Sequence, residues 1–115
     1  MSEETPKISD APLYLLIRDE KIKEFNERKG KGEACDLRGM DFRGLDLRGM
    51  DVENIDFSNS YFRQSDLRGI NFTSCNLEGA NISGANISGV YFPVELSPAE
   101  ISLSHTLGTR MRYRK

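Results

Sequence analysis

The sequence has one histidine, two cysteines and no long apolar run. Its longest apolar stretch, Leu13 to Ile17, is far shorter than the roughly 20 residues that a membrane-spanning helix needs. The first residues also lack the basic and apolar pattern of a secretion signal. We therefore expect a cytoplasmic protein that does not contact a membrane.

An excess of charge of one sign is also missing. Sixteen Lys and Arg residues oppose eighteen Asp and Glu residues, for a net charge of −2. This balance excludes a partner held by bulk charge alone, so we do not expect a nucleic-acid or lipid ligand. With 115 residues, of which 37% are hydrophobic, the chain has room for a single fold with a modest core.

An apolar residue does, however, return at every fifth position. The residue before it is Asp or Asn in ten of twelve cases, and Gly often follows two positions later. A helix needs a spacing of 3.6 and a strand a spacing of 2, so a spacing of five predicts a chain that turns a corner in every repeat. Asp, Asn and Gly stabilise such corners. The central residues are Leu37, Phe42, Leu47, Val52, Phe57, Phe62, Leu67, Phe72, Leu77, Ile82, Ile87 and Phe92.

Tandem copies of A-(D/N)-L-x-x, as in the stretch NLEGANISGANISG, resemble the pentapeptide-repeat proteins. The resemblance covers residues 35–94. It implies an all-β solenoid, a right-handed quadrilateral β-helix of about three coils with twenty residues per coil. Residues twenty apart would then lie over one another, with the central residue and the residue two before it pointing inward. We expect Ser60 and Ser65 to be buried and bonded to the backbone.

The same register argues against a disulfide. Cys35 and Cys75 would occupy one column with Ile55 between them, so their Cα atoms would lie about 9–10 Å apart, beyond the reach of a disulfide. Two reduced thiols are the better interpretation.

The two ends of the repeat region need covers, because a stack exposes apolar surface and unpaired backbone. We assign residues 1–34 to an N-terminal helical cap, 35–94 to the β-helix and 95–115 to a C-terminal helix cap with a basic tail. Ser97, Pro98 and Glu100 predict a helix start, and Gly108 its end, so we expect a helix from about Pro98 to Leu107.

Residues from about Pro12 to Lys29 are helical in composition, but their apolar residues fall on two sides. Either this helix is wrapped on two sides or it breaks around Arg18 to Glu20; we favour the break. Residues 1–9 are polar and are expected to be loose. In the tail, Met111 and Tyr113 are expected to pack against the protein, with the arginines outside.

The carboxylates and the single histidine carry no catalytic signal. The aspartates are residues of the repeat and predict turns, and no Ser–His–Asp or Cys–His arrangement can be assembled around His105, which we expect at a helix end. We therefore predict no catalytic residue, no metal site, no cofactor and no enzymatic activity.

Arginine recurs at the outward position after the central residue. Folded by twenties, Arg43 stacks on Arg63 and Arg48 on Arg68, which predicts a basic patch on two faces. Its functional interpretation is a contact with an anionic partner, and its structural interpretation is a solvated face whose guanidinium groups pair with nearby aspartates. The candidate partner-binding residues are Arg43, Arg48, Arg63, Arg68, Arg110 and Arg112.

The resemblance suggests a second function, since the best-known members of the family protect DNA gyrase by imitating duplex DNA with a long acidic rod. Three coils are short for that role, and outward arginines oppose it. The first hypothesis is therefore a non-catalytic protein-interaction or scaffold module, whose partner is another protein or a second copy of the chain. The alternative is a DNA-mimicking protein that binds gyrase or another topoisomerase.

Overall fold

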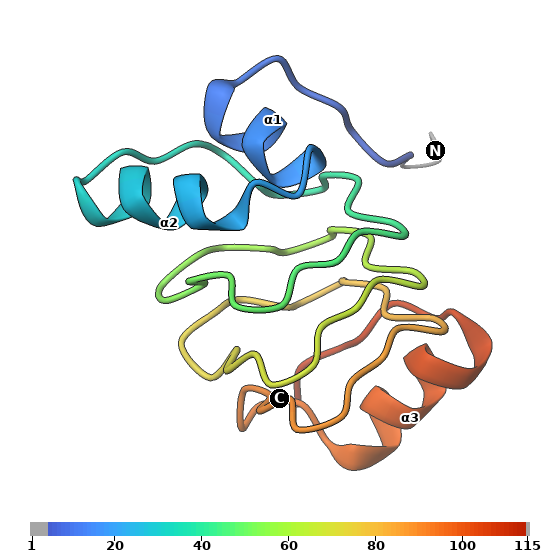
Figure 1. Cartoon of the computed structure of the whole chain (residues 1–115). Helices are drawn as coiled ribbons and strands as arrows, with labels where there is room; N and C mark the ends of the chain where they lie inside the picture. Colours follow the sequence, from blue (N-terminus) through green and yellow to red (C-terminus); the bar gives the residue numbers. More distant parts are fainter. Residues whose placement is uncertain (1–4, 115) are drawn as a thin grey trace.

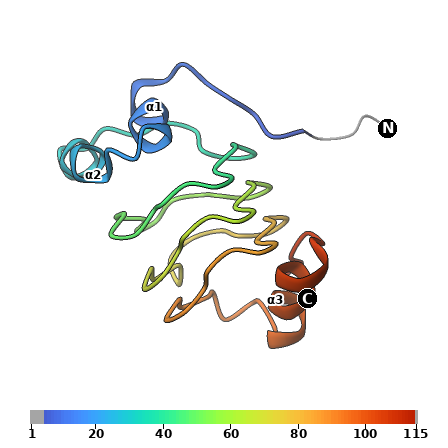
Figure 2. The ribbon, with the colours of Figure 1, turned by 45° about the vertical axis from the view of Figure 1, so that its right-hand side comes forward.

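The computed structural model describes residues 5–114, which form a stack of chain turns between helices at its two ends (Figure 1). Helix α1 spans Pro12–Arg18, α2 spans Ile22–Gly30 and α3 spans Pro98–Leu107. Figures 1 and 2 agree that α1 and α2 lie at one end of the stack and α3 near the other. No helix in this part of the chain is both long enough and apolar enough to cross a bilayer.

The predicted all-β solenoid is wrong in its secondary structure. Residues 5–114 contain three α-helices and no β-strand or sheet, and backbone pairing occurs only at isolated parallel bridges. The physical reason is the length of the repeat. A two-residue turn in nearly every pentapeptide leaves only a single residue in position to pair, whereas a strand needs several consecutive paired residues.

The twenty-residue register is nevertheless present in the bridges. Tyr61 pairs with Asp41 on one side and with Asn81 on the other, and Asp66 pairs with Asp46 and Asn86 in the same way. We call residues 35–54, 55–74 and 75–94 the first, second and third layers. Residues twenty apart in sequence therefore occupy matching places in adjacent layers.

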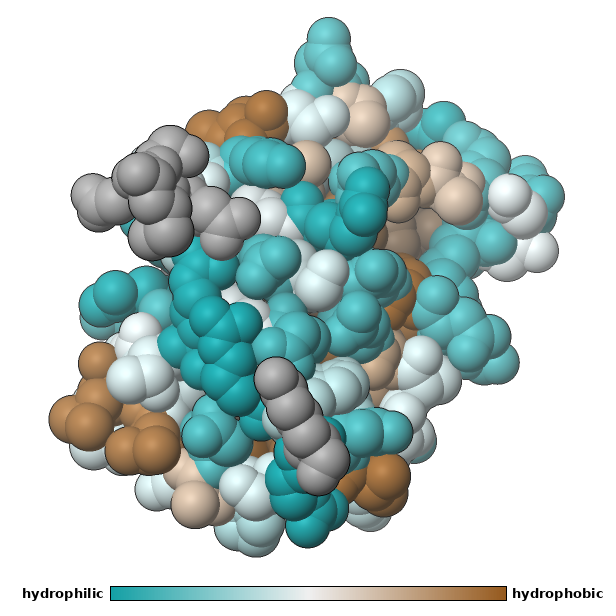
Figure 3. Space-filling model, turned by 180° about the vertical axis from the view of Figure 1, so that it is seen from behind, coloured by the Kyte–Doolittle hydropathy of each residue, from teal (hydrophilic) through white to brown (hydrophobic). Residues whose placement is uncertain are grey.

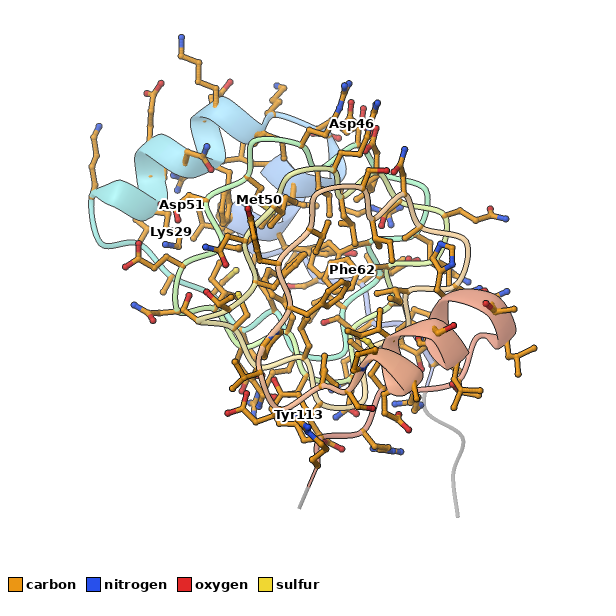
Figure 4. All side chains as sticks on the ribbon, turned by 90° about the horizontal axis from the view of Figure 1, so that it is seen from below. Lys29, Asp46, Met50, Asp51, Phe62 and Tyr113 are labelled. Atoms are coloured by element: carbon orange, nitrogen blue, oxygen red, sulfur yellow. The ribbon has the colours of Figure 1, made fainter. Side chains whose placement is uncertain are left out.

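The core lies inside the stack and is aromatic in its first two layers. Phe42 and Phe62 stack face to face with ring centroids 5.2 Å apart, and Phe57 meets both rings edge-on. Tyr14 of α1 contacts Phe42 edge-on, which joins the N-terminal helices to the core. Seen from below, Phe62 lies in the middle of the stack and Asp46 and Asp51 lie on its rim (Figure 4).

Small polar residues fill the inward positions where the aromatic core leaves little room. Ser60 and Ser65 are buried, and their hydroxyls donate to the carbonyl oxygens of Leu37 at 2.7 Å and Phe62 at 2.6 Å. The predicted burial and bonding of both serines is confirmed. Cys35 and Cys75 are free thiols, and burial raises the pKa of Cys75 to about 11.

The predicted break in the N-terminal helix is confirmed. Helix α1 ends at Arg18, and Glu20 adopts a left-handed backbone with φ of 58° before α2 begins. The break lets two helices bury separate faces, Leu13, Tyr14 and Ile17 from α1 and Phe25 from α2.

Side chains from this cap also serve the free backbone of the first layer. The Glu20 carboxylate accepts from the amide of Asp46 at 2.6 Å, and the Asn26 side chain accepts from Asp51 and donates to Gly49. These contacts satisfy amides that a preceding layer would otherwise bind.

The prediction that residues 1–9 are loose is wrong for the described part of this segment, and residues 1–4 lie outside the described residues. Lys7 donates its backbone N–H to Gly39 and accepts one from Asp41, both at 2.9 Å. The segment is held because it supplies a backbone partner to the first layer, a long-range contact that composition does not reveal.

Helix α3 has the bounds predicted for it. The Ser97 hydroxyl accepts from Glu100 at the start of α3, and Gly108 ends the helix in a left-handed conformation. Met111 is fully buried and exchanges backbone hydrogen bonds with Gly79 and Ala80, as expected for a packed tail. The division of the chain into two caps and a repeat region, at residues 34 and 94, stays a prediction.

Phe62→Ala is expected to lower the free energy of unfolding by about 3–5 kcal/mol, because it opens a cavity among three aromatic neighbours. Leu107→Ala is the control: that side chain is 69% exposed, and its loss should change stability by less than about 0.5 kcal/mol. Urea unfolding followed by circular dichroism measures both, and equal losses would contradict the placement of Phe62 in the core.

Candidate functional site

Four corners of the stack share the sequence D-(L/F)-R-G and a common geometry. The aspartate accepts the backbone N–H of the arginine two residues later and receives its guanidinium in a two-pronged contact. In the Asp46 corner, for example, Arg48 donates Nε at 3.0 Å and Nη2 at 2.8 Å. The four corners are residues 36–39, 41–44, 46–49 and 66–69.

These contacts hold the carboxylates in their charged form. The hydrogen bond from Arg38 lowers the pKa of Asp36 to about 2, and that from Arg48 does the same for Asp46. Each corner thus neutralises its own arginine.

Three of the predicted partner-binding arginines, Arg43, Arg48 and Arg68, are engaged in this way. Arg68 binds Asp66 at 2.7 Å, and Arg48 binds Asp46 and reaches Asp66 of the next layer at 3.4 Å. The structure therefore brings Arg48 and Arg68 together, as predicted, around two carboxylates that balance their charge.

The two arginines of the tail lie elsewhere and also have partners within the chain. Arg110 donates to the Tyr61 hydroxyl at 2.6 Å with its guanidinium over the ring, and Arg112 pairs with Glu78 at 3.1 Å. Both contacts fasten the tail to the stack.

Arg43 and Arg63 lie side by side on a different face, together with Arg18 from the end of α1. They line a shallow open groove of about 510 Å³ whose remaining walls are Asp41, Gly44 and Gln64. The buried Asp41 carboxylate binds Arg43 at 2.9 Å and Arg18 at 3.5 Å. The Arg63 side chain is exposed, and its guanidinium forms no hydrogen bond or ion pair with any of the described residues.

Sequence reasoning missed Arg18 and Gln64. Arg18 reaches the groove only through the packing of α1 on the first layer, for which the sequence carries no signal. Gln64 did carry a signal, since it stands where seven of the twelve repeats have Gly, and it adopts the left-handed backbone of that position with φ of 57°.

A second candidate surface is the outer edge of the third layer. In the second layer, the amides of Leu67, Gly69 and Phe72 donate to carbonyls of the third layer at 2.8–3.0 Å. Their counterparts twenty residues later, Ile87, Gly89 and Phe92, find no acceptor within residues 5–114. Helix α3 and the tail serve the other half of this layer, where Gly79 and Gly84 donate to Met111 and His105.

Large apolar side chains lie exposed around this free edge. Tyr91 is 64% and Val94 is 77% exposed, and the nearby Ile87, Val90 and Phe92 are only partly buried. The face in Figure 3 is mostly hydrophilic, with hydrophobic residues in separate patches. We call residues 86–94 the open edge.

The single histidine and the acidic and cysteine side chains complete the set of candidate residues. His105 lies in the last turn of α3, as expected, and its Nε2 is 2.8 Å from the Ala85 carbonyl oxygen. Among residues 5–114, no three His, Cys, Asp or Glu side chains form a group that could hold a metal ion.

Comparison with known proteins gives one match. The family model for pentapeptide repeats matches residues 33–59 and 55–92, with eight copies. No curated protein and no solved structure matches the chain.

Replacing the guanidinium partner should raise the pKa of the aspartate that it binds and leave the pKa of an aspartate in a separate corner unchanged. In Arg48→Gln we expect the pKa of Asp46 to rise from about 2 toward its ordinary value near 4, while Asp36, whose partner Arg38 is unchanged, stays at about 2. Titration of the side-chain carboxyl carbons by NMR measures both.

The sign for stability follows from the lowered pKa. The contribution of the Asp46–Arg48 pair is present above the ordinary pKa and is lost as the pH falls through about 2. An Asp46 pKa that stays near 2 in the variant would contradict the assignment of the shift to the guanidinium.

Proposed function

Since the chain belongs to the pentapeptide-repeat family, we propose that it is a non-catalytic protein-interaction module that binds a partner along its open edge. The proposal rests on one observation: three consecutive layer-to-layer donors end without an acceptor, beside exposed apolar side chains. A row of unpaired backbone donors at an exposed edge is a template for pairing with another chain.

The kind of partner follows from the donors. The free donors have the same spacing along the chain as the donors that join the second layer to the third. An extended polypeptide segment that runs parallel to residues 86–94 could therefore offer carbonyl oxygens in register. Tyr91 and Val94 would then pack against apolar side chains of that segment. The backbone contacts supply affinity and the side chains supply selectivity.

Imitation of DNA has weaker support. A DNA mimic needs rows of uncompensated carboxylates, whereas Asp36, Asp41, Asp46 and Asp66 are each bound by an arginine two residues later. The face that would imitate a phosphate backbone is therefore largely neutral.

The open edge can be tested by trapping the partner and then mapping where it binds. A photo-crosslinking residue at position 91 identifies the partner in its native cell, and hydrogen exchange of the purified complex then reports on the backbone. We expect exchange of the amides of Ile87, Gly89 and Phe92 to slow at least about 10-fold on binding.

Tyr91→Lys with Val94→Lys should abolish this protection, because charge opposes the apolar contact. Leu15→Lys, at a 44% exposed position on α1, is the matched control and should leave it intact. Binding without slower exchange at the open edge would refute the proposal. Protection that grows with the concentration of the chain alone would identify the partner as a second copy.

A further inference from the structure

The corner beside Arg63 departs from the four D-x-R-G corners in two residues. Where those corners read D-x-R-G, this one reads Tyr61, Phe62, Arg63, Gln64. Tyrosine replaces the carboxylate that would neutralise the arginine, and glutamine replaces the glycine that fits a left-handed backbone without strain. Both replacements fall in one repeat, next to one groove.

The replacements leave positive charge uncompensated. Arg18, Arg43 and Arg63 bring three guanidinium groups to the groove, and Asp41 is the one carboxylate in its lining. Asp41 already binds Arg18 and Arg43, so two charges remain unbalanced. The carboxyl-terminal end of α3 lies near Arg63 at Gly108, but none of the described residues there forms an ion pair with Arg63.

The shape and lining of the groove restrict the ligand. It is shallow and open, and no aromatic or aliphatic side chain lines it, so it offers no surface for a nucleotide base or a lipid chain. It offers guanidinium forks and the Gln64 amide, which suit an oxoanion. A phosphate monoester carries −1.5 to −2 at neutral pH and matches the unbalanced charge, whereas a carboxylate supplies half of it.

We propose that Arg18, Arg43, Arg63 and Gln64 form a binding site for the phosphate monoester of a phosphorylated protein segment. The choice of a protein as carrier of the phosphate rests on the proposed function; the oxoanion site itself rests on the groove alone. The site would bind a partner only in its phosphorylated form, which would make the interaction subject to regulation.

Titration of the full chain with O-phospho-L-serine tests the site without any partner. Inorganic phosphate, L-glutamate and L-serine serve as parallel probes, and the backbone amides of Gly44 and Gln64 report binding by NMR. We expect saturable shifts with phosphoserine and phosphate, weaker shifts with glutamate and none with serine. No saturation up to about 10 mM phosphoserine, or equal affinity for glutamate, would overturn the proposal.

Variants separate this site from general attraction to arginine. Arg63→Gln should weaken phosphoserine binding about 10-fold or more, since it removes a charge-assisted contact. Arg68→Gln, which removes an arginine already paired with Asp66, should leave the affinity unchanged. Equal losses in the two variants would show that bulk charge, not the groove, attracts the ligand.

A further pair of variants keeps Arg63 and changes only Tyr61, two residues before it. Tyr61→Asp places an aspartate two residues before Arg63, as in the D-x-R-G corners, and should weaken binding as much as Arg63→Gln, because the new carboxylate binds the guanidinium. Tyr61→Asn, which lacks the charge, should retain binding; thermal unfolding checks that both variants fold. Retained binding in Tyr61→Asp would refute the role of the unbalanced charge.

This experiment and the one on the open edge can fail separately. If phosphoserine does not bind but a partner still protects Ile87, Gly89 and Phe92, the groove is refuted and the proposed function stands. If phosphoserine binds and no partner protects the open edge, the proposed function is refuted and the oxoanion site stands.

Discussion

The backbone hydrogen bonds between residues about twenty apart hold this molecule together. Phe42 donates to Tyr61 and Phe62 to Asn81, so each layer is positioned by the one beside it. These bonds place Phe42 over Phe62 in the core and Arg43 beside Arg63 on the surface. Core and surface are therefore set by one register, and a shift of the chain by one residue would disrupt both.

The first and third layers each have backbone groups that no further layer can bind. At the first layer, Lys7, Glu20 and Asn26 satisfy backbone groups that no preceding layer binds. At the third layer, α3 and the tail satisfy residues 77–84 and leave the open edge. The two ends are thus capped unequally, and the uncovered part is where the proposed partner would pair.

Local signals made part of this fold predictable. Ser97, Pro98 and Gly108 determine the bounds of α3 through contacts within the helix, and the conflicting apolar faces around Arg18 favoured a break. The register was equally visible, because a spacing of five recurs without interruption. The strands were wrongly expected, because the resemblance implied them and a repeat with a turn in every five residues cannot pair more than one residue at a time.

What could not be predicted depends on contacts between distant segments. The pairing of Lys7 with the first layer and the approach of Arg18 to Asp41 follow from how the N-terminal helices dock. The six candidate arginines could be found by their position, but sequence could not show which have partners. Arg110 and Arg112 find theirs in Tyr61 and Glu78, about 30 to 50 residues away.

The D-x-R-G corner has a consequence for how such a chain can change in length. Each copy brings one acid and one base that bind each other, so a duplicated copy adds surface without adding net charge or long-range repulsion. Gene duplication can therefore lengthen or shorten the stack while its electrostatic field stays nearly constant. Eight of the twelve pentapeptides lack this aspartate–arginine pair, and in one of them Tyr61 stands where the aspartate would pair with Arg63. A change of one residue in a corner can therefore leave a charge without its local partner.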